Sequence, residues 1–269
     1  MDSAPPKLTI RGLCKRFQRH DAEVEALRSI DITIGDGEFV SVLGASGCGK
    51  STLLRMVDGL VEPSEGDLLI DSQPVRGPGT DRAFVFQQDR LLPWRTIEDN
   101  VSFGLELHGT KRREARERAP ELLELVGLAG FAKAYPHELS GGMRQRANIA
   151  RALAVDPDVL LMDEPFAALD WQTREIMQAE LMRIWQERKR TVLFVTHQID
   201  EAVYLSDRIV ILTPRPGQVK ATVTIDIPRP RTLETKRSPE FGRYVDEVWS
   251  LIEREVRDSM GFERAGAGA

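Results

Sequence analysis

The chain has 269 residues, of which 41% are hydrophobic and 29% charged, with a net charge of −5. That length accommodates one large domain or two modest ones with a buried core, and the composition is typical of a soluble globular protein. The acidic balance argues against a nucleic-acid-binding protein, and the two cysteines, Cys14 and Cys48, argue against a disulfide framework. We expect no secretory signal and no membrane span, because no run approaches the roughly 20 apolar residues that a span needs.

The first third of the chain predicts short strands that lead into a glycine-rich loop. Strand-like alternation occupies residues 7–34, and the apolar run 39–43 enters the loop. Residues 50–60 then show a helical pattern, and a turn at 62–66 precedes another short strand. The glycine loop therefore lies between a predicted strand and a predicted helix.

The middle of the chain has a different character. From residue 97 to about 155, charged and apolar residues mix at helical spacing, which predicts an inserted α-helical subdomain. We interpret its run KRREARER, residues 111–118, as a solvated helix face rather than a binding patch.

The rest of the chain predicts a mainly parallel sheet, since short apolar strands alternate with helices. The expected elements are strands at 159–162, 191–196 and 208–212 and a helix at 173–189.

Beyond residue 228 the chain is rich in proline and arginine, and it ends in one amphipathic helix at roughly 241–256. We therefore expect a main domain at residues 7–228 and a C-terminal tail at 229–269.

The strongest motif is GASGCGKST. It fits the pattern G-x-x-x-x-G-K-[ST] between a strand and a helix, which is the context that a phosphate-binding loop requires. Its glycines let backbone N–H groups surround a phosphate, Lys50 adds a charge for the outer phosphates, and the Ser51 hydroxyl is a ligand for Mg²⁺. The predicted nucleotide-binding residues of this loop are Gly44, Ala45, Ser46, Gly47, Cys48, Gly49, Lys50, Ser51 and Thr52.

Cys48 lies inside this loop and has two interpretations. The favoured one is a small residue that merely fits, and the other is a thiol activated by the helix N-terminus. We expect bound nucleotide to shield Cys48 from alkylation.

Two acids follow a predicted buried strand in VLLMDE. Asp163 is a candidate Mg²⁺ ligand, and Glu164 is a candidate base for a water in line with the terminal phosphate. An acidic turn after a strand is common, so this pair gains its weight from the upstream phosphate loop.

Three further residues are candidates only in this context. His197 follows the strand TVLFVT, at the sheet edge where ligands bind in open α/β folds. Gln87 also ends an apolar stretch and is a candidate ligand for Mg²⁺ or water. Phe17 offers an aromatic face to adenine, although a core aromatic of an edge strand would look the same.

The stretch LSGGMRQR contains a second possible anion cradle. Ser140, Gly141 and Gly142 precede a helix-like run, and a helix N-terminus with neighbouring backbone N–H groups attracts anions. This cradle has no lysine and no Mg²⁺ ligands of its own, so by itself it is half a site.

Together these motifs resemble the nucleotide-binding subunit of ABC transporters, over about residues 7–225. GASGCGKST matches Walker A, VLLMDE matches Walker B, LSGGMRQR matches the signature, ALD at 168–170 matches the D-loop, and Gln87 and His197 match the Q-loop and switch positions. The resemblance implies a P-loop NTPase fold of the ABC type, α/β, with a mainly parallel core sheet, an antiparallel β-subdomain and the inserted α-helical subdomain. It also implies ATP and Mg²⁺ as ligands.

The resemblance also answers why one chain carries two cradles. In the family the signature of one subunit covers the ATP held by Walker A of the other, so a head-to-tail homodimer encloses two ATP molecules. Ser140, Gly141 and Gly142 would then serve the partner's nucleotide. Departures from the family pattern are small: Ala45 replaces a common proline, Gln198 replaces the usual aspartate, and Phe17 replaces a frequent tyrosine.

The stretches LLPWRTIEDNV and THQIDEAVYLSDRIVILTPRPG resemble the importer ATPases for nitrate, sulfonates and taurine. This implies two membrane permease subunits, an external solute-binding protein, no nucleic acid, and a peripheral position on the cytoplasmic face of the cell membrane. Leu91, Leu92 and Trp94 are either part of a docking surface for a permease or core residues of the helical subdomain.

Two alternative functions for the whole chain are an ABC ATPase that acts in DNA repair or on ribosomes and a non-catalytic ATP-binding partner.

Overall fold

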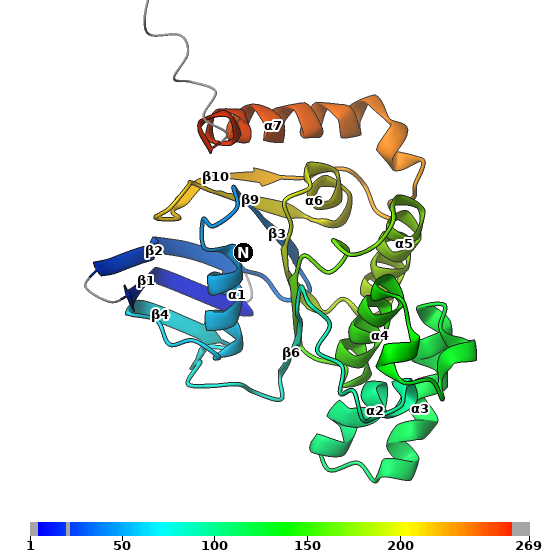
Figure 1. Ribbon diagram of the computed structural model, residues 1–269. Helices are drawn as coiled ribbons and strands as arrows, with labels where there is room; N and C mark the ends of the chain where they lie inside the picture. The colour runs from blue at the N-terminus through cyan, green and yellow to red at the C-terminus, as the bar shows by residue number, and fades with distance from the viewer. Residues whose placement is uncertain (1–4, 20–21, 260–269) are drawn as a thin grey trace, which may run out of the picture. The chain divides into compact units, whose positions relative to one another are not determined.

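The computed structural model describes residues 5–19 and 22–259. The chain divides into two compact units. Unit 1 comprises Met1–Pro78 and Thr191–Ala269, and unit 2 comprises Gly79–Arg190. Figure 1 shows the elements of both.

Unit 1 contains an antiparallel sheet in the order β2-β1-β4-β5. Its strands are β1 (Leu8–Arg19), β2 (Ala22–Ile34), β4 (Glu65–Ile70) and β5 (Gln73–Pro74). Along the end of β2, buried Ile30, Ile32 and Ile34 alternate with exposed residues, which is the pattern of a strand with one face on the core. The sequence predicted several short strands up to residue 34, whereas β1 and β2 are two long paired strands.

Unit 1 also contains the strands that position the glycine loop. They are β3 (Phe39–Leu43), β8 (Thr191–Val195), β9 (Arg208–Leu212) and β10 (Val219–Thr224), in the order β10-β9-β3-β8. Strand β3 pairs in parallel with β8 and β9, and only β10 runs antiparallel. Every residue of β3 and β8 is buried, as expected for central parallel strands.

The described part of unit 1 also contains three helices, α1 (Lys50–Asp58), α6 (Ile199–Leu205) and α7 (Pro239–Ser259), and a short 3-10 turn, η3 (Thr235–Arg237). Helix α7 lies along β10 and α6 (Figure 1), and Lys220 of β10 donates to the Leu251 carbonyl 2.6 Å away. The expected tail helix is thus present, although its first helical residue precedes the predicted start at Phe241.

A buried arginine joins the tail to α6. Arg231 donates to the carbonyls of Val203, Tyr204 and Ser206 at the C-terminal end of α6, at 3.1, 3.1 and 2.7 Å. Cations are favourable at that end of a helix because the last carbonyls have no intrahelical partner. Burial lowers the pKa of Arg231 to about 10, which leaves the side chain charged at neutral pH.

Unit 2 contains two parallel strands and four helices. The strands are β6 (Arg82–Val85) and β7 (Val159–Asp163), and the helices are α2 (Ile97–Leu107), α3 (Arg112–Leu125), α4 (Gly141–Ala154) and α5 (Trp171–Arg188). Two 3-10 turns, η1 (Ala129–Phe131) and η2 (Pro136–Glu138), precede α4. Helices α2, α4 and α5 begin at the side-chain caps Thr96, Ser140 and Asp170, whose oxygens satisfy first-turn N–H groups.

The predicted fold class is confirmed. Unit 1 has the parallel strands and the antiparallel sheet, and α2, α3 and α4 pack together in unit 2 as the expected helical insertion. The sequence analysis noted an apolar stretch ending at Gln87 but did not predict β6 as a strand. Of the helices within residues 5–19 and 22–259, none has the length and apolar character needed to cross a membrane.

Candidate nucleotide-binding site

The glycine loop joins β3 to α1 inside unit 1. Gly47 and Gly49 have φ of 77° and 107°, in the left-handed region that favours glycine. A Cβ at Gly49 would lie 2.6 Å from Leu27 Cδ2 and 3.0 Å from the Ala26 carbonyl, so the backbone there is also closely packed. No side chain caps the N-terminus of α1, which is the arrangement that lets a helix start bind an anion.

Lys50 is the buried cation of this loop. Its Nζ donates to the carbonyls of Gly44 and Ala45 at 2.7 and 3.1 Å, and the residue is 6% exposed. The ammonium group is thus held within the loop rather than extended into solvent. A compact cation beside glycine N–H groups fits a bound phosphate.

The Cys48 side chain is buried in the packing of the loop and is not exposed to solvent. It is 1% exposed, and a Cβ at Gly44 would lie 2.8 Å from its Sγ. Burial raises the pKa of the Cys48 thiol, which outweighs the opposing effect of Lys50. These facts favour the interpretation of Cys48 as a small residue that fits, because a reactive thiol has a lowered pKa.

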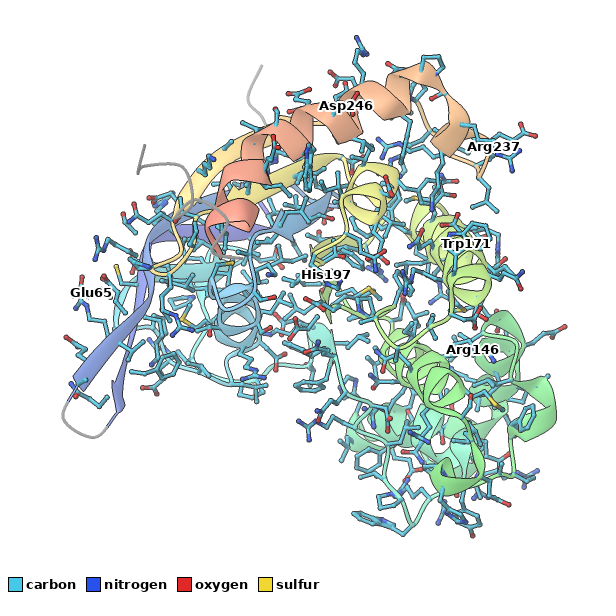
Figure 2. The ribbon with its side chains drawn as sticks, turned by 45° about the horizontal axis from the view of Figure 1, so that its top comes forward. Glu65, Arg146, Trp171, His197, Arg237 and Asp246 are labelled. Carbon is cyan, nitrogen blue, oxygen red and sulfur yellow. The ribbon has the colours of Figure 1, made fainter. Side chains whose placement is uncertain are left out.

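His197 lies at the same sheet edge as the loop. Val42 of β3 pairs with Val195 of β8, so Gly44 and His197 each lie two residues beyond a matched pair. His197, which Figure 2 labels, is exposed. The preceding Thr196 is buried; its hydroxyl donates to Glu201 at 2.6 Å and accepts from the Gln198 N–H at 3.0 Å. The backbone on both sides of His197 is therefore held by the hydrogen bonds of Thr196.

Phe17 is on β1 and is 40% exposed, with Lys15 Nζ 5.0 Å from its ring centroid. An exposed aromatic face agrees better with stacking on a planar ligand than with a core position.

In unit 2, the pairing of two parallel strands also brings Gln87 and Glu164 together. Val85 of β6 pairs with Met162 of β7, and each candidate lies two residues beyond that pair. Gln87 Nε2 donates to Glu164 Oε2 at 3.4 Å. Asp163, the last residue of β7, is 4% exposed. Glu164 has a φ of 45°, a conformation that non-glycine residues rarely adopt and that is enriched at functional sites.

The second cradle lies at the start of α4. Ser140 caps the helix by accepting from the Met143 N–H at 3.2 Å, and Gly141 and Gly142 form the first turn. A Cβ at Gly142 would lie 3.3 Å from Leu169 Cδ2, next to the predicted D-loop. Ser140 and Gly141 are exposed, so this helix start is open to a ligand.

Helix α4 also holds the segment that contains Gln87, a role that the sequence analysis missed. Gln145 and Asn148 both donate to the Phe86 carbonyl, at 3.1 and 3.3 Å. Arg144 Nε pairs with Asp89 at 3.0 Å, and Arg151 donates to the Arg90 carbonyl at 2.6 Å. One helix therefore carries the second cradle at its start and fixes residues 86–90 along its length. The polar residues at i, i+1, i+4 and i+7 in MRQRANIAR were a signal for a bonded helix face.

The segment after residue 90 contains both a buried and an exposed hydrophobic residue. Leu91 is a core residue at 8% exposure, whereas Trp94 is 71% exposed. Asn100 is fully buried, and its Nδ2 donates to the carbonyls of Leu92, Arg95 and Thr96, at 3.1, 3.1 and 3.0 Å. Its Oδ1 accepts from the Leu92 N–H at 2.7 Å. Asn100 thus fixes the turn that presents Trp94.

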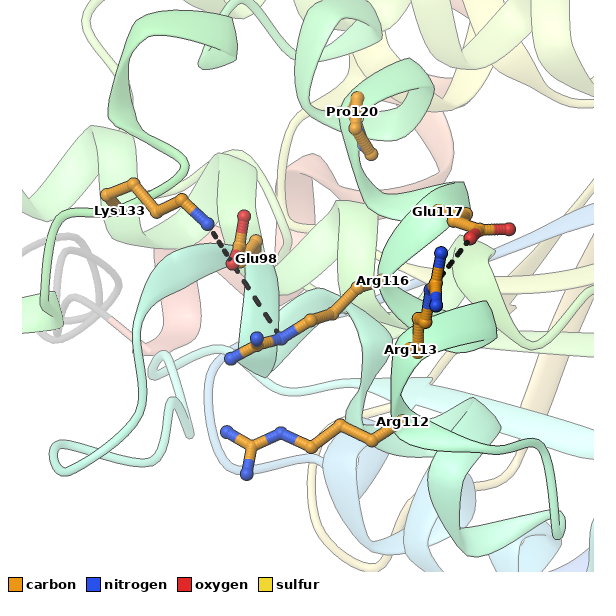
Figure 3. A pocket seen from close by; sticks show the side chains of 7 residues that line it. All are labelled: Glu98, Arg112, Arg113, Arg116, Glu117, Pro120 and Lys133. Carbon is orange, nitrogen blue, oxygen red and sulfur yellow. Dashed lines mark hydrogen bonds and ion pairs between the residues drawn. The ribbon is translucent and has the colours of Figure 1, made fainter.

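The KRREARER run is partly solvated and partly bonded. Figure 3 shows the pocket formed by Glu98, Arg112, Arg113, Arg116, Glu117, Pro120 and Lys133. Arg116 binds Asp99 with two bonds of 2.6 and 2.7 Å, and Arg112 binds it at 3.0 Å. By contrast, Arg113 is 96% exposed. The cations beside the pocket are matched by carboxylates that join α3 to α2, so the run has a structural role.

The fold and these motifs define a P-loop ATPase. Residues 27–167 match the model of the ABC transporter family. An uncharacterised ABC transporter ATP-binding protein, MJ0412 of Methanocaldococcus jannaschii, is 52% identical over 259 residues, covering 96% of each chain. The nitrate import ATP-binding protein NrtD of Synechocystis is 47% identical (94% of this chain, 97% of the relative), and the taurine import ATP-binding protein TauB of Rhizobium johnstonii is 49% identical (87% and 91%).

Among solved structures, the ATP-binding cassette MJ0796, described as a dimeric post-hydrolysis state bound to ADP and Pi, is 34% identical with a TM-score of 0.76. The match covers 82% of this chain and 99% of that one. The chain belongs to the ABC transporter family and is an ATPase of that family. Its relatives place it with the subgroup whose members include nitrate, taurine and aliphatic sulfonate import proteins.

Proposed function

We propose that this chain hydrolyses MgATP at the composite sites of a head-to-tail homodimer and thereby drives solute uptake through separate permease subunits. The solute class is a small anion or organic solute of the nitrate, sulfonate or taurine type. The related import proteins support this class: NrtD for nitrate, TauB for taurine, and SsuB of Bacillus cereus, which is 44% identical to this chain, for aliphatic sulfonates. The proposal also includes an external solute-binding protein as a further partner and a peripheral position on the cytoplasmic face of the cell membrane, as the sequence resemblance implies.

In this proposal the glycine loop binds the phosphates. Its backbone N–H groups and the start of α1 surround them, Lys50 donates to the outer oxygens, and Phe17 stacks on adenine. The positive φ values of Gly47 and Gly49 and the buried Lys50 support the assignment.

Glu164 is the proposed base. Its carboxylate orients the attacking water and accepts its proton, while Gln87 orients the same carboxylate through the bond at 3.4 Å. His197 is proposed to donate to an oxygen of the terminal phosphate as charge develops there, which lowers the barrier electrostatically.

Mg²⁺ fits the donor set of these motifs. No group of three or more His, Cys, Asp or Glu residues suited to a metal occurs in the described part of the chain. Mg²⁺ in ATPases usually takes only one or two protein ligands together with phosphate oxygens and water, so Ser51, Gln87 and Asp163 are sufficient. When bound, the ion supplies positive charge that neutralises the phosphates.

The observation that carries the dimer proposal is the cradle at the start of α4. Ser140 and Gly141 are exposed at a helix N-terminus. The neighbouring guanidinium of Arg144 is already bonded to Asp89 and to the Leu139 carbonyl, so it does not take the part that Lys50 takes in the glycine loop. An exposed half-site of this kind becomes complete only when another molecule supplies the rest. The dimeric form described for MJ0796 supports a second copy of the chain as that molecule.

A mixing experiment tests the head-to-tail arrangement. Lys50→Ala and Ser140→Arg are each expected to abolish hydrolysis, and Ser140→Arg should still bind ATP. In a mixed dimer one site receives both substitutions and the other receives neither. Mixing the two inactive proteins should therefore restore one intact site, measured as partial ATPase activity.

The double variant with both substitutions on one chain is the matched control and should stay inactive at every concentration. Failure of the mixture to recover ATPase activity, with both single variants folded and able to dimerise, would contradict the cross-subunit role of Ser140. Loss of ATP binding in Ser140→Arg alone would contradict it as well.

A further inference from the structure

The turn between β9 and β10 is closed by its own hydrogen bonds and lies outside the motifs described above. Its sequence is TPRPGQ, residues 213–218. The Thr213 hydroxyl donates to the Pro216 carbonyl at 3.1 Å and accepts from the Gln218 N–H at 3.0 Å, while the Thr213 N–H bonds the Gln218 carbonyl at 2.9 Å. These bonds set the direction in which the turn presents Arg215.

Backbone bonds attach this turn to β2. The Gly217 N–H donates to the Ala26 carbonyl at 3.0 Å, and the Arg28 N–H donates to the Gly217 carbonyl at 2.9 Å. A Cβ at Gly217 would lie 2.1 Å from the Cys48 carbonyl oxygen. The turn therefore packs against the glycine loop backbone to backbone, within unit 1.

Arg215 completes this contact from the outer side of the loop. Its Nε and Nη2 donate to the same acceptor, the Gly47 carbonyl, at 3.2 and 3.1 Å. Hydrogen bonds from a charged donor are stronger than neutral ones, and the planar guanidinium fixes their direction. Arg215 is exposed, so the pair is open to solvent and its effect is moderate.

The bonded carbonyl belongs to a peptide that shapes the loop. The C=O of Gly47 and the N–H of Cys48 point in opposite directions because the peptide is planar and trans. The Cys48 N–H bonds the Ala45 carbonyl at 3.2 Å, which closes the turn over residues 45–48. By holding the Gly47 carbonyl, Arg215 also holds this turn.

The loop needs such support because it is rich in glycine. Gly44, Gly47 and Gly49 have more conformational freedom to lose than other residues, so an unsupported loop pays that entropy when a phosphate orders it. Lys50 binds the same loop from within, through the Gly44 and Ala45 carbonyls. Arg215 adds a second positive charge on the outer side.

We propose that Arg215 is a positioning residue that holds the glycine loop in its phosphate-binding conformation before nucleotide arrives. The proposal rests on the proposed assignment of residues 44–52 as the nucleotide-binding loop. Arg215 does not touch the reacting atoms in this role. Its effect is on affinity for nucleotides that carry a β-phosphate, and not on the hydrolytic step.

The test compares Arg215→Ala and Arg215→Lys with the full-length wild type. Loss of two charge-assisted bonds at an exposed site should raise the Kd for ATP and for ADP by roughly three- to tenfold. KM should rise with Kd while kcat stays within about twofold, since Glu164 and His197 are untouched. Arg215→Lys keeps the charge and one donor direction, so it should recover part of the affinity.

Arg11→Ala is the matched control. Arg11 is an exposed arginine on β1, so its removal changes the net charge equally without touching the turn or the loop. It should leave Kd and KM at the wild-type values. A rise in Kd equal to that of Arg215→Ala would attribute the effect to net charge and overturn the proposal.

The Cys48 thiol provides a readout of the loop itself. It is buried by the closed loop, so alkylation without nucleotide reports how often the loop opens. Peptide mass spectrometry separates Cys48 from Cys14. Arg215→Ala should label Cys48 faster at an unchanged rate for Cys14, and saturating ATP should slow both proteins to the same rate.

The outcomes separate this inference from the proposed function. Wild-type protein that binds no ATP would refute the assignment of the loop. Wild-type protein that binds ATP, with equal Kd and equal Cys48 labelling in Arg215→Ala, would refute the role of Arg215 alone. If Arg215→Ala unfolds at a lower temperature than wild type, the Arg215→Lys variant decides. A raised Kd for ATP in Arg215→Lys at wild-type stability supports the positioning role. An unchanged Kd for ATP in that variant overturns it.

Discussion

At the scale of single residues, the backbone of Glu164 is the feature most closely tied to the proposed chemistry. Its φ of 45° follows the fully buried strand β7, and its carboxylate accepts from Gln87. A rarely populated conformation held by a rigid strand orients a side chain at the cost of strain. The sequence indicated Glu164 and Gln87 as separate candidates, and the strand register accounts for their contact.

Glu164→Gln should abolish steady ATP hydrolysis while leaving ATP binding intact, because an amide keeps the size of the side chain but accepts no proton. The variant should accumulate as an ATP-bound dimer. Light scattering with and without ATP, together with measurement of retained nucleotide, checks both parts. Wild-type turnover in this variant would remove Glu164 from the role of base, and Glu175→Gln, on α5, is a suitable control for the loss of one carboxylate.

At the scale of elements, the ion pairs between α2 and α3 make a pH-dependent contribution. Arg116 and then Arg112 hold the pKa of Asp99 down to about 2, against the opposing effect of its burial. A carboxyl whose pKa is lowered on folding stabilises the protein above its unfolded-state pKa, and this stability is lost as pH falls through the folded-state value. The relevant window is therefore between about pH 4 and pH 2.

Asp99→Asn should lower the free energy of unfolding by about 2 kcal/mol at neutral pH, from a pKa shift of nearly two units. The difference from wild type should shrink as pH approaches 2. Urea unfolding followed by circular dichroism at several pH values measures it. Glu117→Gln is the control, because the pair of Glu117 with the largely exposed Arg113 should contribute little. A difference independent of pH would contradict the ion-pair account.

The sequence predicted helices and strands well where a hydrophobic pattern continued over many residues or where a motif lay within one short stretch. The phosphate loop, β7 and the helical insertion are of this kind. It did not predict contacts between distant segments. Arg215 and Gly47 are 168 positions apart, and Gln145 and Phe86 are 59 positions apart, so no local pattern joins them. The cap at Ser140 was partly visible, but the predicted helix began at Met143, because two glycines disfavour a helix start that the serine cap stabilises.

At the scale of the whole molecule, transport requires a contact with a membrane partner as well as hydrolysis. Trp94 is the most exposed large hydrophobic residue of the described chain, and buried Asn100 fixes the turn that presents it. An aromatic side chain on a rigid turn is well suited to anchor a protein interface.

Trp94→Ala should therefore reduce transport more than ATP hydrolysis by the isolated subunit. In a deletion strain grown on taurine, an alkanesulfonate or nitrate as the single source, the wild-type gene should restore growth on the transported compound. Trp94→Ala should restore it poorly, while the purified variant keeps its basal ATPase activity. Trp171→Ala, an equally exposed tryptophan at the start of α5 (Figure 2), is the comparison. Full growth with Trp94→Ala would exclude Trp94 as an anchor.

Helix α4 has a mechanical consequence. Its 14 residues span about 21 Å at the usual rise of an α-helix, and an α-helix does not shorten measurably under the forces of side-chain contacts. A displacement of Ser140 along the helix axis should therefore move Arg144, Gln145, Asn148 and Arg151 by a similar distance. In the proposed dimer, nucleotide held by the partner would then shift residues 86–90, which these four side chains hold, through the motion of one stiff helix.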